Sequence, residues 1–83
     1  MRIAICDDNE IQIGIFMHRI NNFLKRNGDI KALITPYDKG QPLIDDVADG
    51  EWYDIVVLDI VLREENGIEV AKELRLNGYD GNI

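Results

Sequence analysis

An apolar run that ends in a carboxylate constrains this chain more than any other feature. The segment Asp54–Asp59 holds four consecutive apolar residues and ends in an acid, which is typical of a strand buried inside a parallel sheet. The segment Met1–Asp8 repeats the plan and ends in two acids. If these are neighbouring parallel strands, their carboxyl ends meet at one edge of the sheet, and Asp7, Asp8 and Asp59 lie there together.

The rest of the chain alternates between helix and strand. Apolar residues recur at steps of three and four from Glu10 to Asn27, which predicts an amphipathic helix. The other predicted segments are an edge strand from Ile30 closed by Pro36, a short helix with Pro42 in its first turn ended by Gly50, a third helix capped by Asn66 and stopped at Asn77–Gly78, and the start of a further strand at Gly81–Ile83. This β-α alternation predicts an α/β fold with a parallel sheet of strand order 2-1-3.

Composition narrows the functional classes. The chain has 83 residues, 46% hydrophobic and 30% charged, which suits one folded domain. A net charge of −7 argues against direct nucleic-acid binding, which needs clustered basic residues. The single cysteine, Cys6, excludes an internal disulfide and fits a reducing cytoplasm. We expect no membrane contact, because the sequence has no signal-peptide pattern and no apolar segment of transmembrane length.

Three clustered carboxylates predict a bound cation. Without one, their charges would repel and oppose ionisation. A hard divalent ion relieves this repulsion, and Mg²⁺ prefers a few carboxylate or carbonyl oxygens while keeping several waters. An open coordination position would then be available to a phosphoryl group.

These residues resemble the receiver domain of two-component response regulators, which has a flavodoxin-like fold. The resemblance runs the whole length of the chain and rests on the acidic pair Asp7 and Asp8, on Asp59, on Gly67 eight residues later, and on the segment Tyr37–Gly40. The segments Ile3–Asn9 and Asn66–Ala71 are most similar to receivers of the LytTR class. Those receivers act in transcription regulation through a separate DNA-binding domain, which is absent here.

The resemblance implies a role for each acid. Asp59 would be the phosphoacceptor, which takes a phosphoryl group from the phosphohistidine of a sensor histidine kinase. Asp8 and Asp59 would ligate Mg²⁺ directly, with the backbone carbonyl of Val61 as third protein ligand and Asp7 acting through a bound water. Such a module assists its own phosphorylation without being a stand-alone enzyme.

Two departures from the family pattern stand out. Arg63 occupies the position, four residues after the acceptor, where many receivers have proline. The family's later β-α units carry a Ser or Thr that senses the phosphoryl group and a Lys that pairs with it, and the sequence stops before both. We therefore expect residues 1–83 to be a partial receiver, truncated near the start of strand 4. We also expect the unpaired edge beside the third strand to drive self-association.

Alternative functions remain open at this point. A Mg²⁺-dependent phosphatase of the haloacid-dehalogenase type also uses an aspartyl nucleophile. It would require a second acid two residues after that nucleophile, where this chain has Val61. A nucleotide-binding module would need a glycine-rich phosphate loop, which is missing. A pure interaction or oligomerisation module, in which the acids are incidental, is the remaining alternative.

The other reactive or aromatic side chains have simpler expected roles. Cys6 is expected to be a small buried hydrophobe, and His18, the single histidine, a surface residue. Trp52 and Tyr53 should pack at the entrance of the strand that leads to the acceptor. The pair Glu64–Glu65 is expected to lie in a solvated loop.

Overall fold

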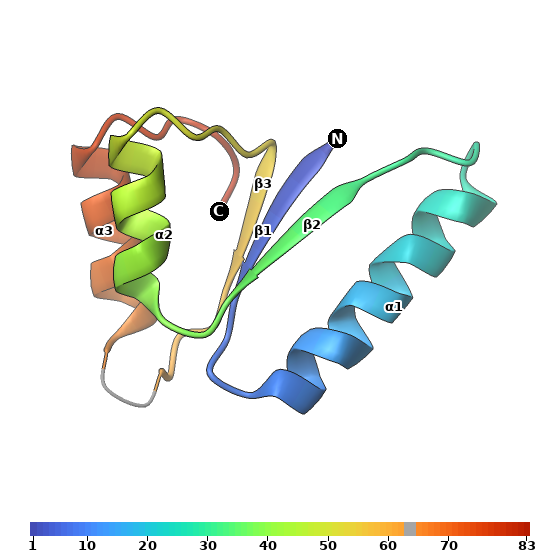
Figure 1. Cartoon of the computed structure of the whole chain (residues 1–83), viewed down its shortest axis with the longest axis horizontal. Helices are drawn as coiled ribbons and strands as arrows, with labels where there is room; N and C mark the ends of the chain where they lie inside the picture. The colour runs from blue at the N-terminus through green and yellow to red at the C-terminus, as the bar shows by residue number, and fades with distance from the viewer. Residues whose placement is uncertain (63–64) are drawn as a thin grey trace.

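The computed structural model describes residues 1–62 and 65–83. Strands and helices alternate along the chain, as predicted (Figure 1). In order they are β1 (Arg2–Cys6), α1 (Glu10–Arg26), β2 (Leu33–Tyr37), α2 (Gly40–Ala48), β3 (Ile55–Leu58) and α3 (Gly67–Leu76).

The strands form one parallel sheet in the order β2-β1-β3, which confirms the predicted order. Cys6, the last residue of β1, is paired with Tyr37 on one side and with Leu58 on the other. The three strands therefore end level with one another. The residues that follow β1 and β3 emerge at the same edge of the sheet.

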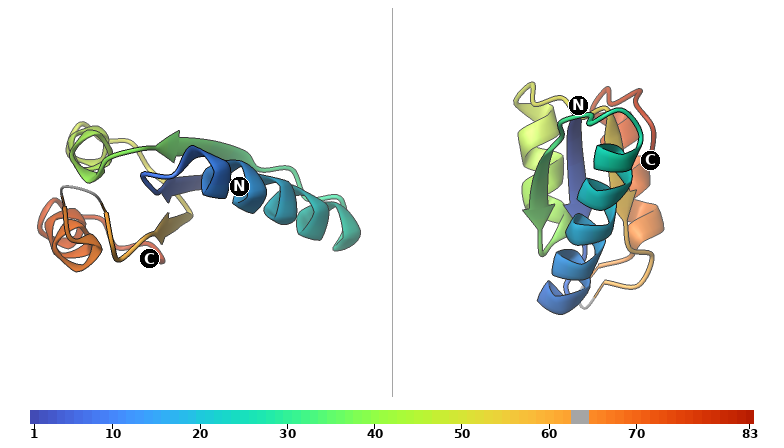
Figure 2. Two further views of the ribbon diagram at one scale, coloured as in Figure 1. Left: turned by 90° about the horizontal axis from the view of Figure 1, so that it is seen from below. Right: turned by 90° about the vertical axis from the view of Figure 1, so that its right-hand side faces the viewer.

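Helices cover the two faces of the sheet unequally (Figures 1 and 2). α2 and α3 lie together on one face, and α1 lies on the other. The larger hydrophobic cluster lies between the sheet and the α2–α3 pair and includes Val56, Leu43 and Leu74. The smaller one consists of Ile3, Ile5 and Ile13 with partly buried neighbours. Most of the buried apolar contact that holds the sheet in place therefore comes from α2 and α3.

The second strand differs from its predicted bounds. β2 begins at Leu33, and Pro36 lies inside it, opposite Ile5. The Leu33 amide donates to the Met1 carbonyl, and the Tyr37 carbonyl accepts the Asp7 N–H. Alternate residues of β2 therefore face the β1 side, and Pro36 faces outward. A proline is tolerated there because an edge strand needs no donor on its outer side. The prediction of an edge strand is confirmed, and the prediction that Pro36 closes it is wrong.

Asparagine side chains cap two of the helices, at Asn66 as predicted and also at Asn9, and α2 is the exception. Asn9 and Asn66 accept backbone N–H groups at the starts of α1 and α3. α2 begins at Gly40, two residues before Pro42, and Lys39 at its N-cap position makes no side-chain cap hydrogen bond. The Gly40 N–H instead donates to Oε1 of Glu65 at 2.7 Å. The start of α2 is therefore fixed by a residue 25 positions away in sequence.

The last residues of the chain run along the outer side of β3. The Val56 amide donates to the Asn82 carbonyl at 2.8 Å, and Ile55 and Asn82 form an isolated parallel bridge. The Tyr79 hydroxyl, from a side chain 2% exposed, donates to the Tyr53 carbonyl. These contacts agree with the predicted start of a further strand at Gly81–Ile83. No helix within the described ranges is long and apolar enough to cross a membrane.

Candidate functional site

The structure brings together the three acids singled out from the sequence. Asp7 and Asp8 follow β1, Asp59 follows β3, and one carboxylate oxygen of each lies within 4.8 Å of the others. All three residues are half-buried. The register of β1 against β3 is the cause, since Cys6 and Leu58, the last residues before the acids, are paired with each other.

Backbone hydrogen bonds fix the positions of two of these acids. The Asp7 amide donates to the Tyr37 carbonyl, and the Asp59 amide donates to the Cys6 carbonyl, each at 3.0 Å. Both residues are thus held by the ends of the sheet ladders. The side chains of the same two acids also accept backbone hydrogen bonds. Oδ1 of Asp7 accepts the Asn9 N–H at 2.9 Å, and Oδ1 of Asp59 accepts the Val61 N–H at 3.2 Å. The Oδ2 atoms of Asp7 and Asp59 make no hydrogen bond with the described residues.

The electrostatics of the edge favour a cation. The ion pairs found among the described residues are Arg2–Glu51 and Lys72–Glu69, and neither involves the cluster. Three carboxylates within 4.8 Å of one another repel without a positive partner. Their oxygens are the donors that Mg²⁺ prefers, so the donor set fits a hard divalent ion.

Cys6 forms part of the floor of this edge. Its side chain is fully buried, which confirms the prediction of a small buried hydrophobe. Burial raises the pKa of the thiol from 9.0 to about 12, and the negative charges of Glu65 and Asp7 and then of Asp38 and Asp59 add to the effect. The thiol is therefore protonated at neutral pH and is not a candidate nucleophile.

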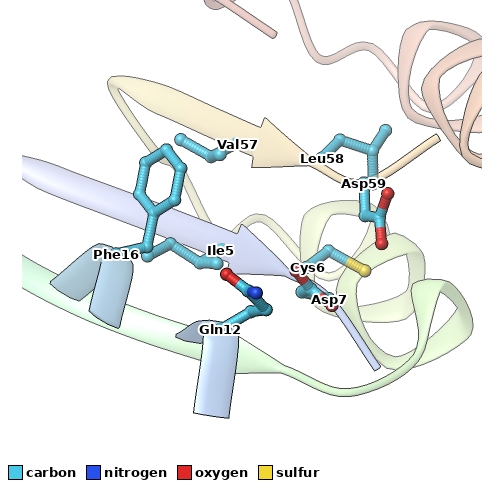
Figure 3. A pocket seen from close by; sticks show the side chains of 8 residues that line it. All are labelled: Ile5, Cys6, Asp7, Gln12, Phe16, Val57, Leu58 and Asp59. Atoms are coloured by element: carbon cyan, nitrogen blue, oxygen red, sulfur yellow. The ribbon is translucent and has the colours of Figure 1, made fainter. Parts of the chain in front are cut away.

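A cavity of about 360 Å³ opens beside the acids (Figure 3). Asp7 and Asp59 line one part of it, together with the apolar residues at the ends of β1 and β3. Gln12 and Phe16 of α1 line another part and lie on the same side of β1 as Ile5. The sequence interpretation missed these two residues as part of the site. They are four residues apart in the predicted helix, a spacing that places them on one helix face.

Gly67 makes the close approach of α3 to the acceptor possible. Its N–H donates to the Ile60 carbonyl at 2.9 Å. A Cβ atom at this position would collide with the backbone of Asp59 and Ile60. The glycine noticed in the sequence thus lets the start of α3 pack directly against the residues that follow β3.

The other predicted residues divide into those that the structure places and those that it does not. Val61 is 78% exposed and bridges to Asn66, and the role of its carbonyl stays a prediction. Arg63 and Glu64 lie outside the described residues. Glu65 corrects the prediction of a solvated loop, because it is half-buried and binds the Gly40 N–H.

The aromatic and histidine predictions also have distinct outcomes. Tyr53 is buried at 2% exposure, as expected, and its hydroxyl shares a 2.6 Å hydrogen bond with that of Tyr37. Trp52 remains 45% exposed while packing against the Tyr79 ring at 5.2 Å between centroids. His18 is exposed, as expected, and its ring hydrogen-bonds to Asn22.

Comparison with known proteins identifies the fold. No family model and no curated protein sequence matches the chain, but solved structures do. A structure described as a yeast Spc42 trimeric coiled-coil segment fused to another structure matches with a TM-score of 0.80 and 17% identity, over 99% of this chain and 50% of that one.

Two response regulators are also similar to it. The N-terminal domain of a response regulator/sensory box/GGDEF protein from Carboxydothermus hydrogenoformans matches with a TM-score of 0.70 and 23% identity, over 92% of this chain and 56% of that chain. The MaeR response regulator bound to beryllium trifluoride matches with a TM-score of 0.68 and 24% identity, over 99% and 62%.

These matches confirm the predicted fold class. The sheet order and the arrangement of helices are those of the flavodoxin-like receiver fold. The chain spans between half and about three-fifths of the length of the solved chains that it matches. Fold similarity by itself does not assign an activity. Function has to be argued from the edge of the sheet that carries Asp7, Asp8 and Asp59, which we call the acidic edge.

Proposed function

We propose that the chain is the phosphoacceptor module of a two-component response regulator and that Asp59 receives the phosphoryl group. The observation that carries this proposal is the set of three carboxylates, from the ends of β1 and β3, with oxygens within 4.8 Å of one another. Ligands of doubly wound sheets bind beyond the carboxyl ends of the strands, where these acids lie. Similarity to response-regulator folds supports the same assignment.

Each acid has a separate proposed task. Asp8 and Asp59 bind Mg²⁺ directly, the Val61 carbonyl is the third protein ligand, and Asp7 acts through a bound water. When bound, the ion neutralises negative charge on the oxygens of the transferring phosphoryl group. Oδ1 of Asp59 already accepts the Val61 N–H, which helps to fix the orientation of the carboxylate.

The chemical step is an in-line displacement at phosphorus. An Asp59 carboxylate oxygen forms a bond to phosphorus while the bond from phosphorus to the histidine nitrogen of the donor breaks. The electron pair of the broken bond stays on the imidazole nitrogen. The protein contributes position, since the Asp59 amide is held by the Cys6 carbonyl at 3.0 Å. The module acts as a receiver and not as a stand-alone enzyme.

The proposed partner and setting are those that the resemblance to receiver domains implies. We propose a sensor histidine kinase as phosphodonor, a cytoplasmic location, and a LytTR-like pathway in which a separate domain binds DNA. The net charge of −7 supports the view that this segment does not bind DNA directly. Phosphorylation by a kinase carrying phosphohistidine, with transfer of label to this chain, is the direct measurement of the partner class.

Adduct formation on Asp59 tests the proposed function. The chain is incubated with Mg²⁺ and acetyl phosphate, and intact-mass spectrometry measures the fraction that gains one phosphoryl group. We expect the adduct in the wild-type chain and its loss in Asp59→Asn. Asp49→Asn, outside the acidic edge, is the matched control and should retain the adduct. Beryllium trifluoride, which MaeR binds, provides a second probe, read out as a Mg²⁺-dependent spectral change.

A second candidate function is self-association through the edge of β3. The Asp59 amide donates to the Cys6 carbonyl of β1. Because successive residues of a strand point their backbone groups to opposite sides, the N–H and C=O of Leu58 point away from β1. Asn82 pairs with Val56 on that outer side, and no described residue pairs with the outward backbone groups of Leu58. Sedimentation velocity at increasing concentration tests this candidate, and monomers throughout would contradict it.

A further inference from the structure

The sequence contains three Asn-Gly pairs, and each lies at the end of a helix. They are Asn66–Gly67 at the start of α3, Asn77–Gly78 at its end and Asn27–Gly28 at the end of α1. The backbone nitrogen of the residue after an asparagine can attack the side-chain amide, and glycine hinders this attack least because it has no Cβ atom. All three pairs have this chemistry in common, so the structure around each pair decides which of them reacts.

The pair at the start of α3 is held by hydrogen bonds at both reacting groups. The Gly67 N–H donates to the Ile60 carbonyl at 2.9 Å, and Oδ1 of Asn66 accepts the Ile68 N–H at 2.8 Å. Gly67 is also buried. Attack by the Gly67 nitrogen would therefore require α3 to move away from the residues that follow β3, which is a local unfolding event.

The pair at the end of α3 is held by the residues that follow it. The Gly78 N–H donates to the Arg75 carbonyl at 3.1 Å. The Arg75 guanidinium donates to the carbonyls of Tyr79 and Gly81 at 3.0 and 2.7 Å, and Tyr79 is 2% exposed. Ring closure requires rotation about the Cα–C bond of Asn77 to bring the next nitrogen toward the side chain. This rotation would displace the buried tyrosine.

The pair at the end of α1 lacks these anchors. The Gly28 N–H donates to no acceptor among the described residues, and residues 27–31 are all exposed. Gly28 and Asp29 both have positive φ angles, 100° and 53°, and a positive φ is uncommon for a residue other than glycine. Rotation about the Cα–C bond of Asn27 displaces only this exposed turn.

The remaining contacts of the turn do not change the comparison. Nδ2 of Asn27 donates to the Phe23 carbonyl at 2.7 Å, and Asn77 makes the same bond to Glu73 at 2.8 Å. The amides of residues 29–30 donate to the last turn of α1, but exposed backbone bonds at a helix end open at a low cost in free energy. The two helix ends therefore differ in the buried anchor that follows α3.

The turn lies on the β2 side of the sheet. Figure 1 shows it where the chain passes from α1 into β2, at the opposite end of α1 from the acidic edge and away from β3. Access of water to Asn27 therefore does not depend on what covers the outer side of β3.

We propose that Asn27 is a site of spontaneous deamidation in the folded chain, with the Gly28 backbone nitrogen as nucleophile, and that the fold protects Asn66 and Asn77. The Gly28 nitrogen loses its proton and forms a bond to Cγ of Asn27. The bond from Cγ to Nδ2 breaks, and the departing amide group takes up a proton and leaves as ammonia. Water then opens the resulting cyclic imide at either carbonyl, which leaves aspartate or isoaspartate at position 27. This inference does not depend on the proposed function.

Deamidation would weaken the end of α1. The new carboxylate lies at the negative end of the helix dipole, where an anion is unfavourable, and it cannot donate to the Phe23 carbonyl as Nδ2 does. Isoaspartate also adds a methylene group to the backbone between α1 and β2. The covalent state of this turn therefore changes with the age of the protein.

Peptide mapping tests the proposal, because cleavage after lysine and arginine places each Asn-Gly pair in a separate peptide. The folded chain is incubated at neutral pH, and chromatography with mass spectrometry measures the fraction of aspartate and isoaspartate at each position over time. We expect these products to form at Asn27 at least about tenfold faster than at Asn66 or Asn77, since those two react only from locally opened states. In the chain unfolded by urea, the three rates should agree within about threefold, because local structure no longer separates them.

Variants of the chain connect the protection of Asn77 to its anchor. Arg75→Ala removes both hydrogen bonds to the residues after α3 and should speed deamidation of Asn77 by about three- to tenfold, as expected for the loss of such bonds. The rate at Asn27 should not change. Arg19→Ala, at an exposed position of α1, is the matched control and should change neither rate. Circular dichroism confirms that both variants are folded.

Three outcomes would overturn the proposal. The first is equal deamidation rates at the three pairs in the folded chain. The second is absence of products at Asn27 in the folded chain while the unfolded chain forms them. The third is an unchanged rate at Asn77 in Arg75→Ala, because the fold would then not be the source of its protection.

Discussion

The carboxylate of Glu65 accepts the backbone N–H of Gly40 at 2.7 Å. This bond joins the loop after β3 to the first turn of α2. It also places a negative charge at the positive end of the helix dipole, where a carboxylate is favourable. The bond thus performs the task of the side-chain cap that Lys39 does not provide.

Loss of this bond should destabilise the fold. We expect Glu65→Ala to lower the free energy of unfolding by about 1–2 kcal/mol, the range found for loss of an N-cap. Glu65→Gln keeps an acceptor and should lose less. Urea denaturation followed by circular dichroism measures both. Glu73→Gln, at an exposed position of α3, is the control, and an equal loss in that variant would show that the cap is unimportant.

Replacement of Gly67 should disrupt the acidic edge. In Gly67→Ala the new Cβ would collide with the backbone of Asp59 and Ile60. We expect a loss of at least about 2 kcal/mol, because well-packed backbone cannot move without strain, and a loss of phosphoryl adduct on Asp59. The matched change Gly14→Ala meets nothing within 4 Å in the middle of α1 and should stabilise by about 0.5–1 kcal/mol. Thermal unfolding compares the two variants.

The buried thiol of Cys6 should make the free energy of unfolding decrease as the pH rises above neutral. Its thiol has a pKa of about 12 in the folded chain, raised from 9.0. Between these values the unfolded chain releases the proton and the folded chain keeps it, so unfolding is favoured as pH rises. The slope is at most about 1.4 kcal/mol per pH unit for one group.

Urea titrations between pH 8 and pH 11 measure this slope. Cys6→Ala should make the decline shallower without removing it, because burial also raises the pKa of Tyr37 and Tyr79. An unchanged slope in Cys6→Ala would contradict the assignment. The comparison uses the pH dependence, so the constant cost of the cavity left by the substitution does not affect it.

Mg²⁺ should stabilise the chain through the acidic edge. At one hundred times the dissociation constant, a ligand that binds the folded state alone adds about 2.7 kcal/mol. Asp8→Asn should remove most of this gain. Without metal, the same variant should be as stable as the wild type or more stable, because one repelling charge is gone. Thermal melts with Mg²⁺ and with EDTA measure both effects, and Asp49→Asn serves as control.

The acidic edge could be predicted from the sequence because each of two apolar runs, both read as strands, is followed directly by an acid. Strands that end in Asp8 and Asp59 bring those residues together as soon as the strands are parallel neighbours. The interaction of Glu65 with Gly40 could not be predicted in this way, since it joins residues 25 positions apart through a loop with no periodic pattern. Pro42 lies in the first turn of α2, as predicted, but the residue that fixes the start of this helix could not be predicted for the same reason.

The bounds of β2 were missed for a different reason. Proline usually ends a strand, and that rule placed the end of β2 at Pro36. The rule fails on the outer side of a sheet, where no neighbour needs the missing N–H. Sequence indicated an edge strand, but the direction in which Pro36 points is fixed by pairing with β1.

The outward position of Pro36 has a consequence for assembly. A strand arriving beside β2 would find one backbone donor absent and a ring in its place, so this border of the sheet is a poor template for addition. At the opposite border, the Val56 amide already donates to the Asn82 carbonyl, so the chain itself occupies part of the outer side of β3. At β2, by contrast, the backbone of the strand itself opposes the approach of another strand.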